Sequence, residues 1–581
     1  MRRDFCNPMN LSYKYQHLNN QASREAADPT LIYFKGKYYM FASMSGGFFY
    51  SDDLIEWKWH ENRNLELYKY APDVRQIGEY LVFSASSRGK GVMYRTLDPF
   101  SEKYEKVCET FSFWDPNTFQ DDDGRVYFYW GCDNGKLIYG IELDPEKLTP
   151  VGKKKPLIFG RQTEFGWERP NYPGRENDEQ DTPLATKLFH IMMALSGRSP
   201  DRPYIEGAFM NKWNGKYYLQ YAAPGTEIAT YGDGVYVSDN PLGPFSVQKH
   251  NPFSSRPSGF ITGAGHGSTI EDAHGNFWHA ATNRVSINAN FERRIGLFPA
   301  GFDKDGVLFC NQRFADYPVD IPEGKFDPWD VKPKWMLLSY KKPCNASSFI
   351  SGHEPKLAAD EDIRSCWCAH HSRDEWFQMD LEQAYPVHAV QINFADVDVP
   401  MLQRDKAELS NFETGRRYID TDHSLKTRYL LEGSLDGQQW FVLADKREAD
   451  TDLPHDYLRF DGVLVRYLRI TAVQLPYDKK FALSGLRVFG LGNGPKPDIV
   501  KNVSAVFSDP MTAQLRWDPV DGAVGYEVQY GISPDKLYSS YLVYEKPEVL
   551  LTTLNVNQEY YVRIDSFNEN GVTEGTVQSI R

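Results

Sequence analysis

The sequence has few cysteines, no long apolar run and a deficit of positive charge. Its 581 residues include seven cysteines, at positions 6, 108, 132, 310, 344, 366 and 368, and no Cys-x-x-Cys pair. A zinc ribbon or thioredoxin-like motif is therefore unsupported, and we expect mostly free, buried thiols. No stretch approaches the ~20 uncharged apolar residues that cross a bilayer, so we expect no membrane span.

Lysine and arginine are outnumbered by aspartate and glutamate, 65 to 79, which gives a net charge of −14. Affinity for nucleic acid comes largely from Lys and Arg contacts to phosphates, so nucleic acid is excluded as the main partner. The first eight residues lack the apolar core of a signal peptide. If the protein is exported, its leader was removed before this numbering begins.

Aromatic residues are abundant, with 36 Tyr, 35 Phe and 13 Trp, or 14% of the chain. With 44 Gly and 35 Pro, this composition favours short strands joined by tight turns. Exposed aromatic rings also stack on the apolar faces of sugars. The composition predicts an all-β protein.

A recurring pattern fills the chain to about residue 325. Each copy begins at a polar or acidic residue, continues as a β-run, turns at a glycine and returns as an aromatic-rich run. The copies begin at Asp28, Asp73, Asp115, Glu206 and His266. Five copies of four strands predict a five-bladed β-propeller over residues 1–327. The polar insertion from Arg161 to Pro203 is expected to form a loop at one face.

Two further β-regions follow the repeats. Residues 338–492 alternate without any apolar period of helical length, which predicts a β-sandwich. The Gly/Pro linker at 492–497 separates this region from residues 497–581, which have the size of one small sandwich.

Three of the polar residues that open the copies are carboxylic acids: Asp28, Asp115 and Glu206. Because inner strands of a propeller begin near its central axis, these groups can meet at one end. Paired carboxylates in different environments are what glycoside hydrolysis requires, one ionised and one protonated. A single Asp before proline is commonly a turn residue, but recurrence at one phase of a repeat favours a site.

Residues 20–320 resemble glycoside hydrolase family 43, a family of five-bladed propellers. The matching pieces are Ala27-Asp28-Pro29, Ala71-Pro72-Asp73, Trp114-Asp115-Pro116, Ile205-Glu206-Gly207 and Gly265-His266-Gly267-Ser268. The resemblance implies Asp28 as general base, Asp115 as the residue that modulates the acid's pKa, Glu206 as general acid, and inversion at the anomeric carbon. It implies a structural role for Asp73.

The resemblance also suggests how substrate is held. His266 would lie on the propeller axis, where it either contacts substrate and water or ligates a structural calcium. No other cofactor is expected. Of Arg293 and Arg294, strand alternation turns only one inward, and we choose Arg294 to reach the sugar. Trp114, Phe49 and Trp167 are candidates to stack on a sugar, although Trp114 also suits the core.

The middle region resembles the factor 5/8 type C, or discoidin-like, jelly-roll sandwich. The resemblance rests on the segments 359–367 and 375–381. We expect it to brace the propeller rather than to bind sugar, because no convincing set of binding residues is visible. The last region resembles fibronectin type III through Trp517, Tyr526 and the segment around Tyr560, which indicates a spacer.

These inferences predict an inverting, exo-acting glycoside hydrolase that releases terminal sugars from oligo- or polysaccharide side chains. The family favours α-L-arabinofuranose, followed by β-xylose and β-galactofuranose. The alternative is a non-catalytic glycan-binding protein, but such a protein would tolerate loss of one carboxylate, and all three are present. A polymeric substrate and these domains together favour a periplasmic or secreted protein.

Overall fold

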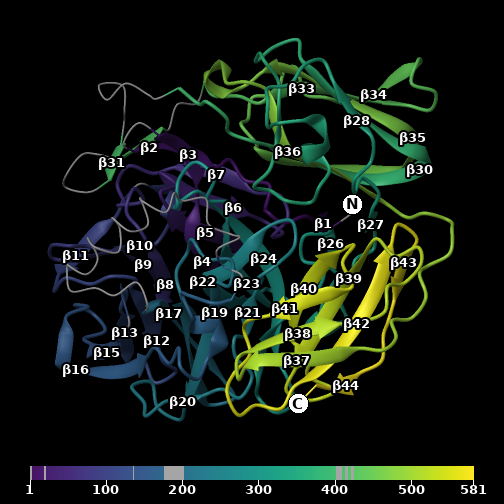
Figure 1. The fold of residues 1–581 in the computed structure, drawn as a ribbon. Helices are drawn as coiled ribbons and strands as arrows, with labels where there is room; N and C mark the ends of the chain where they lie inside the picture. The colour runs from purple at the N-terminus through teal and green to yellow at the C-terminus, as the bar shows by residue number, and fades with distance from the viewer. Residues whose placement is uncertain are drawn as a thin grey trace.

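The computed structural model describes residues 3–18, 21–101, 103–134, 137–173, 175, 202–400, 409–411, 417–420 and 424–580. Within these ranges the regular elements are strands and short 3-10 turns, which confirms the all-β prediction. Figure 1 shows three lobes: the propeller (purple to teal), the middle domain (green) and the C-terminal sandwich (yellow). In the part of the chain described, no helix is long and apolar enough to cross a membrane.

Five four-stranded antiparallel blades form the propeller, as the repeat predicts. The first two blades are β4 (Ala27–Phe34), β5 (Lys37–Ser43), β6 (Gly47–Ser51) and β7 (Lys58–Glu61), then β8 (Asp73–Ile77), β9 (Tyr80–Ser84), β10 (Val92–Thr96) and β11 (Glu105–Glu109). The third is β12 (Asn117–Gln120), β13 (Val126–Trp130), β15 (Leu137–Leu143) and β16 (Pro150–Phe159). The last two are β17 (Tyr204–Trp213), β18 (Lys216–Ala223), β19 (Gly232–Ser238) and β20 (Ser246–Val247), then β22 (Thr262–Glu271), β23 (Phe277–Arg284), β24 (Arg293–Phe302) and β25 (Leu308–Cys310).

Hydrogen bonds from side chains join the inner strands of neighbouring blades in a closed ring. Going round the ring, the donor–acceptor pairs are Thr30 to the Pro72 carbonyl (2.8 Å), the Thr118 amide to Asp73 (2.7 Å), the Met210 amide to Asn117 (2.9 Å), Asn211 to the Thr269 carbonyl (2.8 Å), and the Leu31 amide to Ser268 (2.9 Å). The ring fixes the position at which each inner strand begins. A site assembled from several blades needs this, because its residues come from different inner strands.

Asp73 belongs to this ring and not to the site. It is buried, and its two carboxylate oxygens accept from the Thr118 amide and from Asn117 of the next blade. Burial raises its pKa to about 6, against the lowering effect of Arg75 and these hydrogen bonds. This geometry agrees with the structural role expected for it.

The middle domain is built on an eight-stranded sheet that encloses its own apolar core. Its strands are β27 (Met336–Leu337), β28 (Cys344–Ala346), β29 (Trp367–Cys368), β30 (Trp376–Phe394), β33 (Arg428–Ser434), β34 (Trp440–Asp445), β35 (His455–Gln474) and β36 (Ala482–Gly490). Register shifts interrupt the pairing of the two longest strands, β30 and β35. Such bulges bend strands and let one sheet wrap round a core.

The C-terminal domain is a sandwich of two sheets, as predicted. One holds β37 (Ser504–Asp509), β38 (Thr512–Arg516) and β41 (Glu548–Leu551). The other holds β39 (Gly525–Gly531), β40 (Ser539–Tyr544), β42 (Tyr561–Asn568), β43 (Gly571–Thr573) and β44 (Gln578–Ser579). Trp517 and Tyr526 pack edge to face in its core, with ring centroids 5.1 Å apart. The assignment to the fibronectin type III class stays a prediction.

An N-terminal arm joins the propeller to the middle domain. Its strand β2 (Lys14–Leu18) pairs with β3 (Gln21–Glu25) on one side and with β32 (Arg417–Asp420) of the middle domain on the other. β3 in turn lies parallel to β24 of the fifth blade, where Glu25 is paired with Arg293. A sheet therefore runs without a break from the fifth blade into the middle domain.

Two further predictions concern loops and thiols. Most of the insertion from Arg161 to Pro203, at 174 and 176–201, lies outside the described residues. All seven cysteines are free, and Cys6, Cys310, Cys366 and Cys368 are buried. This confirms the expectation of mostly free thiols.

Candidate active site

Three residues of the site adopt a left-handed backbone conformation in or just before an inner strand. Asp28, Asp115 and His266 each have a positive φ of 49–50°, and the register of β4 and β22 shifts at Asp28 and His266. Residues other than glycine rarely adopt this conformation, and such strained positions gather at functional sites. In the fourth blade the residue with positive φ is Gly207, at 65°, where the register of β17 shifts. Glu206 therefore comes one residue before the position that Asp28, Asp115 and His266 occupy in their blades.

Asp28 is held as an ionised carboxylate. Its Oδ1 lies 3.0 Å from Nη1 of Arg293 and 3.4 Å from Nδ1 of His266, and its Oδ2 accepts from Ser43 at 2.5 Å. Burial alone would raise the pKa of Asp28, but Arg293 and His266 outweigh burial and hold the pKa below its ordinary value. An ionised, hydrogen-bonded carboxylate suits a general base.

Asp115 is in the opposite state. It is buried, its Oδ1 accepts from Ser86 at 3.2 Å, and its Oδ2 accepts from the Gly207 amide at 3.3 Å. Burial raises the pKa of Asp115 to about 7, and the charges of Glu206 and Asp28 act in the same direction, against His266. Near neutral pH this carboxyl therefore retains its proton for a large part of the time.

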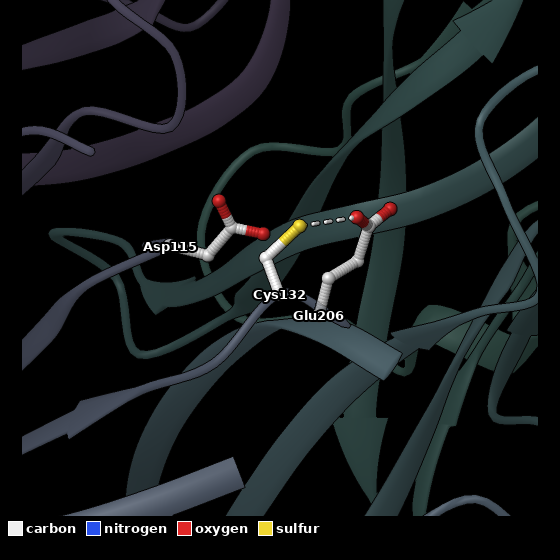
Figure 2. Close-up of side chains that lie close together, drawn as sticks. All are labelled: Asp115, Cys132 and Glu206. Atoms are coloured by element: carbon white, nitrogen blue, oxygen red, sulfur yellow. Dashed lines mark hydrogen bonds between the residues drawn. The ribbon is translucent and has the colours of Figure 1, made fainter. Parts of the chain in front are cut away.

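Glu206 is half-buried beside Asp115, with a thiol between them (Figure 2). Cys132 donates from Sγ to Oε2 of Glu206 at 3.2 Å, and the Tyr231 hydroxyl donates to Oε1 at 2.6 Å. Ligand atoms of Asp115, Cys132 and Glu206 all lie within 4.8 Å of one another. The two carboxyls therefore lie close enough for the charge of Glu206 to raise the pKa of Asp115.

His266 lies between the base and this pair. Its Nδ1 is 3.4 Å from Asp28 and 3.8 Å from Asp115, and its backbone amide donates to Asp233 at 2.7 Å. Burial lowers its pKa, but Asp28 and Asp115 raise it more, so the pKa lies above its ordinary value. A Cβ on Gly207 would lie 2.8 Å from the imidazole ring, so only glycine permits this approach.

The surroundings of His266 do not match a calcium cage. Calcium takes six to eight oxygen ligands. Of the carboxylates around His266, Asp28 is already paired with Arg293, and the two oxygens of Asp233 accept from the His266 and Gly267 amides. Among the described residues, the one group of three that could hold a metal is Asp115, Cys132 and Glu206. We therefore derive no catalytic step through a cation.

The structure corrects the choice between the two arginines. Arg293 contacts Asp28, as the alternation argument requires of one of them. Arg294 points away from the site: its Nε donates to His455 of the middle domain at 2.7 Å, and its Nη1 donates to the Arg24 carbonyl at 2.8 Å. The sequence could not decide between them because Arg293 is oriented by Glu25, which comes from the N-terminal arm.

Two of the proposed stacking residues are buried in the core, so their assignment to sugar binding is wrong. Phe49 is 1% exposed and packs in the apolar cluster that also holds Met40 and Trp278, from the first and fifth blades. Trp167 is fully buried and lies against Tyr221, with ring centroids 5.4 Å apart. Without a free face, neither ring can receive a sugar.

Aromatic rings that sequence reasoning did not select lie beside the base. Phe291 is 40% exposed, and its ring centroid is 5.7 Å from that of Tyr70. The Arg293 guanidinium lies over both rings, 5.2 Å from Phe291 and 5.5 Å from Tyr70. Trp114, directly before Asp115, is half-buried and remains a candidate for sugar contact.

Cys132 and Tyr231 were also missed, although the sequence holds a signal for the first. The second strand of each blade runs back toward the end where the first begins. Ser43, Ser86, Cys132 and Thr282 lie within two residues of the ends of such strands, and each hydrogen-bonds to Asp28, Asp115 or Glu206. Small polar residues at that position therefore mark the site.

Replacing Cys132 with alanine is expected to lower kcat/KM about two- to tenfold, because the carboxyl of Glu206 loses one of the two hydrogen bonds that orient it. Cys132→Ser, which retains a donor, is the matched control and should keep a rate near that of the wild type. An alanine variant with the wild-type kcat/KM contradicts this role.

Comparisons with known proteins agree with the geometry. Residues 19–308 match the family model of glycosyl hydrolases family 43, and residues 357–470 match the NedA-like, galactose-binding domain of the F5/F8 type C class. A β-xylosidase of Xylanibacter ruminicola is 29% identical over 176 residues, covering 29% of this chain and 52% of the relative. A xylosidase/arabinosidase of Bacteroides ovatus is 27% identical over 165 residues, covering 28% and 46%.

The chain thus spans about half the length of these curated relatives. Among solved structures, a glycoside hydrolase aligns with a TM-score of 0.44 at 18% identity, covering 80% of this chain and 97% of that one. The propeller of this chain belongs to glycosyl hydrolase family 43, and a discoidin-like domain of the F5/F8 type C class follows it.

Proposed function

We propose that the propeller is an inverting, exo-acting glycoside hydrolase that releases terminal sugars from the side chains of oligo- or polysaccharides. The observation that carries this proposal is the pair of opposite ionisation states at one end of the axis. Arg293 lowers the pKa of Asp28, whereas burial raises that of Asp115, whose carboxyl lies beside that of Glu206. An ionised base and a proton donor are the two groups that inverting hydrolysis needs.

In the proposed reaction, Asp28 removes a proton from a water molecule as that water attacks the anomeric carbon. Glu206 gives its proton to the departing glycosidic oxygen, so the sugar leaves as a neutral alcohol. Asp115, whose carboxyl lies within 4.8 Å of that of Glu206, takes the modulating role that the family resemblance implies. Tyr231 and Cys132 fix the orientation of the acid through their hydrogen bonds.

For the sugar, we propose α-L-arabinofuranose first, β-xylose second and β-galactofuranose third. Relatives named β-xylosidase, xylosidase/arabinosidase and arabinoxylan arabinofuranohydrolase support the first two. The exposed ring of Phe291 and the half-buried Trp114 offer surfaces on which a terminal sugar ring can pack. We also propose that the reaction needs no cofactor and that the protein acts in the periplasm or outside the cell.

The ionisation states predict a bell-shaped dependence of kcat/KM on pH. Activity should fall on the acid side only below the ordinary aspartate pKa of 3.8, because Asp28 must be ionised and its pKa is lowered. On the alkaline side it should fall about tenfold per pH unit above about 7, as the carboxyl of Asp115 loses its proton. Initial rates on an unactivated disaccharide from pH 3 to 9 measure both limbs, and a flat profile up to pH 9 contradicts the assignment.

A panel of nitrophenyl glycosides of the three sugars, followed by arabinoxylan and arabinan, tests the activity itself. The anomeric configuration of the first product, read by proton NMR during turnover, tests inversion. A retained configuration overturns the mechanism, whereas binding of the sugars without turnover makes the protein a glycan binder. Longer products from the polymers would show endo action.

A further inference from the structure

The discoidin-like domain contacts the propeller directly behind the catalytic base. Two strands that lie side by side, β3 and β24, connect the two regions, with Glu25 and Arg293 paired across them. In each strand, consecutive residues point in opposite directions, because side chains alternate along a strand. Glu25 and Arg293 point toward Asp28, whereas their neighbours Arg24 and Arg294 point into the middle domain.

On the side that faces the active site, Arg293 is held between Glu25 and Asp28. Its Nε donates to Oε1 of Glu25 at 2.8 Å, and Nη1 and Nη2 contact the two oxygens of Asp28 at 3.0 and 3.2 Å. Glu25 also accepts from Gln16, on the strand β2 that pairs with β32 of the middle domain. The position of the guanidinium therefore depends on the position of Glu25.

On the other side, Arg24 is clamped by the middle domain. It is fully buried, and its Nη1 and Nη2 donate to the two oxygens of Asp452 at 2.5 and 3.0 Å. Its Nε lies 3.3 Å from Asp396, which also pairs with Lys479. A bidentate arginine–carboxylate pair fixes geometry as well as charge, so β3 is held in one place.

Arg294 makes the matching contact from β24. Burial and the charges of Arg294 and Arg24 hold the pKa of His455 well below its ordinary value, so the imidazole is neutral. Its Nδ1 lies 2.8 Å from the amide oxygen of Asn393, which assigns the proton to Nδ1 and leaves Nε2 to accept from Arg294 at 2.7 Å. Both strands behind the base are thus fixed by residues of the middle domain.

The loop that carries Phe291 is fixed by the same domain. Asn288 donates to the Asp396 carbonyl at 3.0 Å. Val285 and Ile287 pack with Phe260 of the propeller and Ile363 of the middle domain. The base and the exposed ring at the mouth of the site are therefore both supported from the middle domain.

We propose that the discoidin-like domain is a working part of the catalytic site, and that Asp452 is a positioning residue for the base, acting through Arg24, Glu25 and Arg293. This proposal rests on the function proposed above for Asp28. It makes the domain more than a separate module for sugar binding, because this domain holds the two strands that place Glu25 and Arg293 against the base. It also predicts that the propeller without the middle domain has a misaligned base.

Asp452→Asn in the full chain tests the proposal. We expect kcat on the best nitrophenyl glycoside to fall about 10- to 100-fold, with KM changed less than about threefold, because the base is displaced while the sugar still binds. The acid limb should also move to higher pH, since a displaced Arg293 no longer holds down the pKa of Asp28. A purely structural role would not move that limb.

Two further variants keep the test decisive. Arg24→Lys retains the buried charge and cannot form the bidentate pair, so it should fold and show the same losses if Asp452→Asn does not fold. Asp380→Asn removes the Arg466–Asp380 pair on the same domain, which is partly exposed and lies in the eight-stranded sheet, to which β3 does not belong. This control should keep the wild-type kcat and pH profile.

Hydrogen exchange separates this proposal from the proposed function. Peptides covering residues 21–28 and 293–297 should exchange at least several times faster in Asp452→Asn than in the wild type and in Asp380→Asn. If the wild type hydrolyses no glycoside, the proposed function fails. The hydrogen-exchange rates then decide by themselves whether Asp452 holds the strands behind Asp28 in place. Wild-type exchange and kcat in Asp452→Asn, or equal losses in Asp380→Asn, would overturn the proposal.

Discussion

Replacing Asp28 with asparagine is expected to lower kcat by about 10²–10⁴-fold while sugar binding stays within a few-fold of wild type. Asparagine has the same shape and tolerates the positive φ of 50° at this position, so the bulge persists. What is lost is the negative charge that Arg293 and His266 stabilise and that removes a proton from water. Steady-state kinetics on an arabinofuranoside or xyloside, together with calorimetric titration of the free sugar, measure the two effects.

Asp73→Asn is the matched control for this variant. Asp73 is a buried carboxylate that also opens an inner strand, but it accepts hydrogen bonds from Asn117 and Thr118 of the next blade and lies outside the site. We expect it to retain activity and to lose some thermal stability. If Asp28→Asn unfolds the protein while Asp73→Asn does not, Asp28 serves the fold, and the hydrolytic proposal loses its base.

The repeat was readable from the sequence because inner strands open with a polar residue and return through a glycine turn. Gly124, Gly215 and Gly275 have φ between 76° and 84°, as such turns require. Because Asp28, Asp115 and His266 occupy the same position in their repeats, they lie together at one end of the axis. Glu206 is offset by one residue because Gly207 takes the bulge, a detail that depends on register and not on composition.

The errors have a common physical origin. The alternation of side chains along a strand predicts which residues share a face of that strand. It does not predict whether that face meets a neighbouring blade or the pocket. Phe49 faces the next blade and Arg294 faces the middle domain, whereas Arg293 faces the base. Those distinctions depend on segments far away in the sequence, above all on the arm that places Glu25 beside Arg293.

Glu206→Gln should produce a loss that depends on the leaving group. On natural glycosidic linkages we expect kcat to fall about 10²–10⁴-fold, because the departing sugar alkoxide must receive a proton. On dinitrophenyl glycosides the loss should be much smaller, since that phenolate leaves without a proton. Glutamine can still accept from Tyr231 at Oε1, so the site keeps its shape.

The matched control for the acid is Glu168→Gln. Glu168 is fully buried, accepts from Tyr221 at 2.5 Å, and burial raises its pKa to about 7, yet it contacts none of the three catalytic candidates. Its variant should therefore treat both kinds of leaving group as the wild type does. Equal losses on both substrates would instead assign Glu206 to binding, and the proton donor would have to be Asp115, the neighbouring carboxyl whose pKa burial raises to about 7.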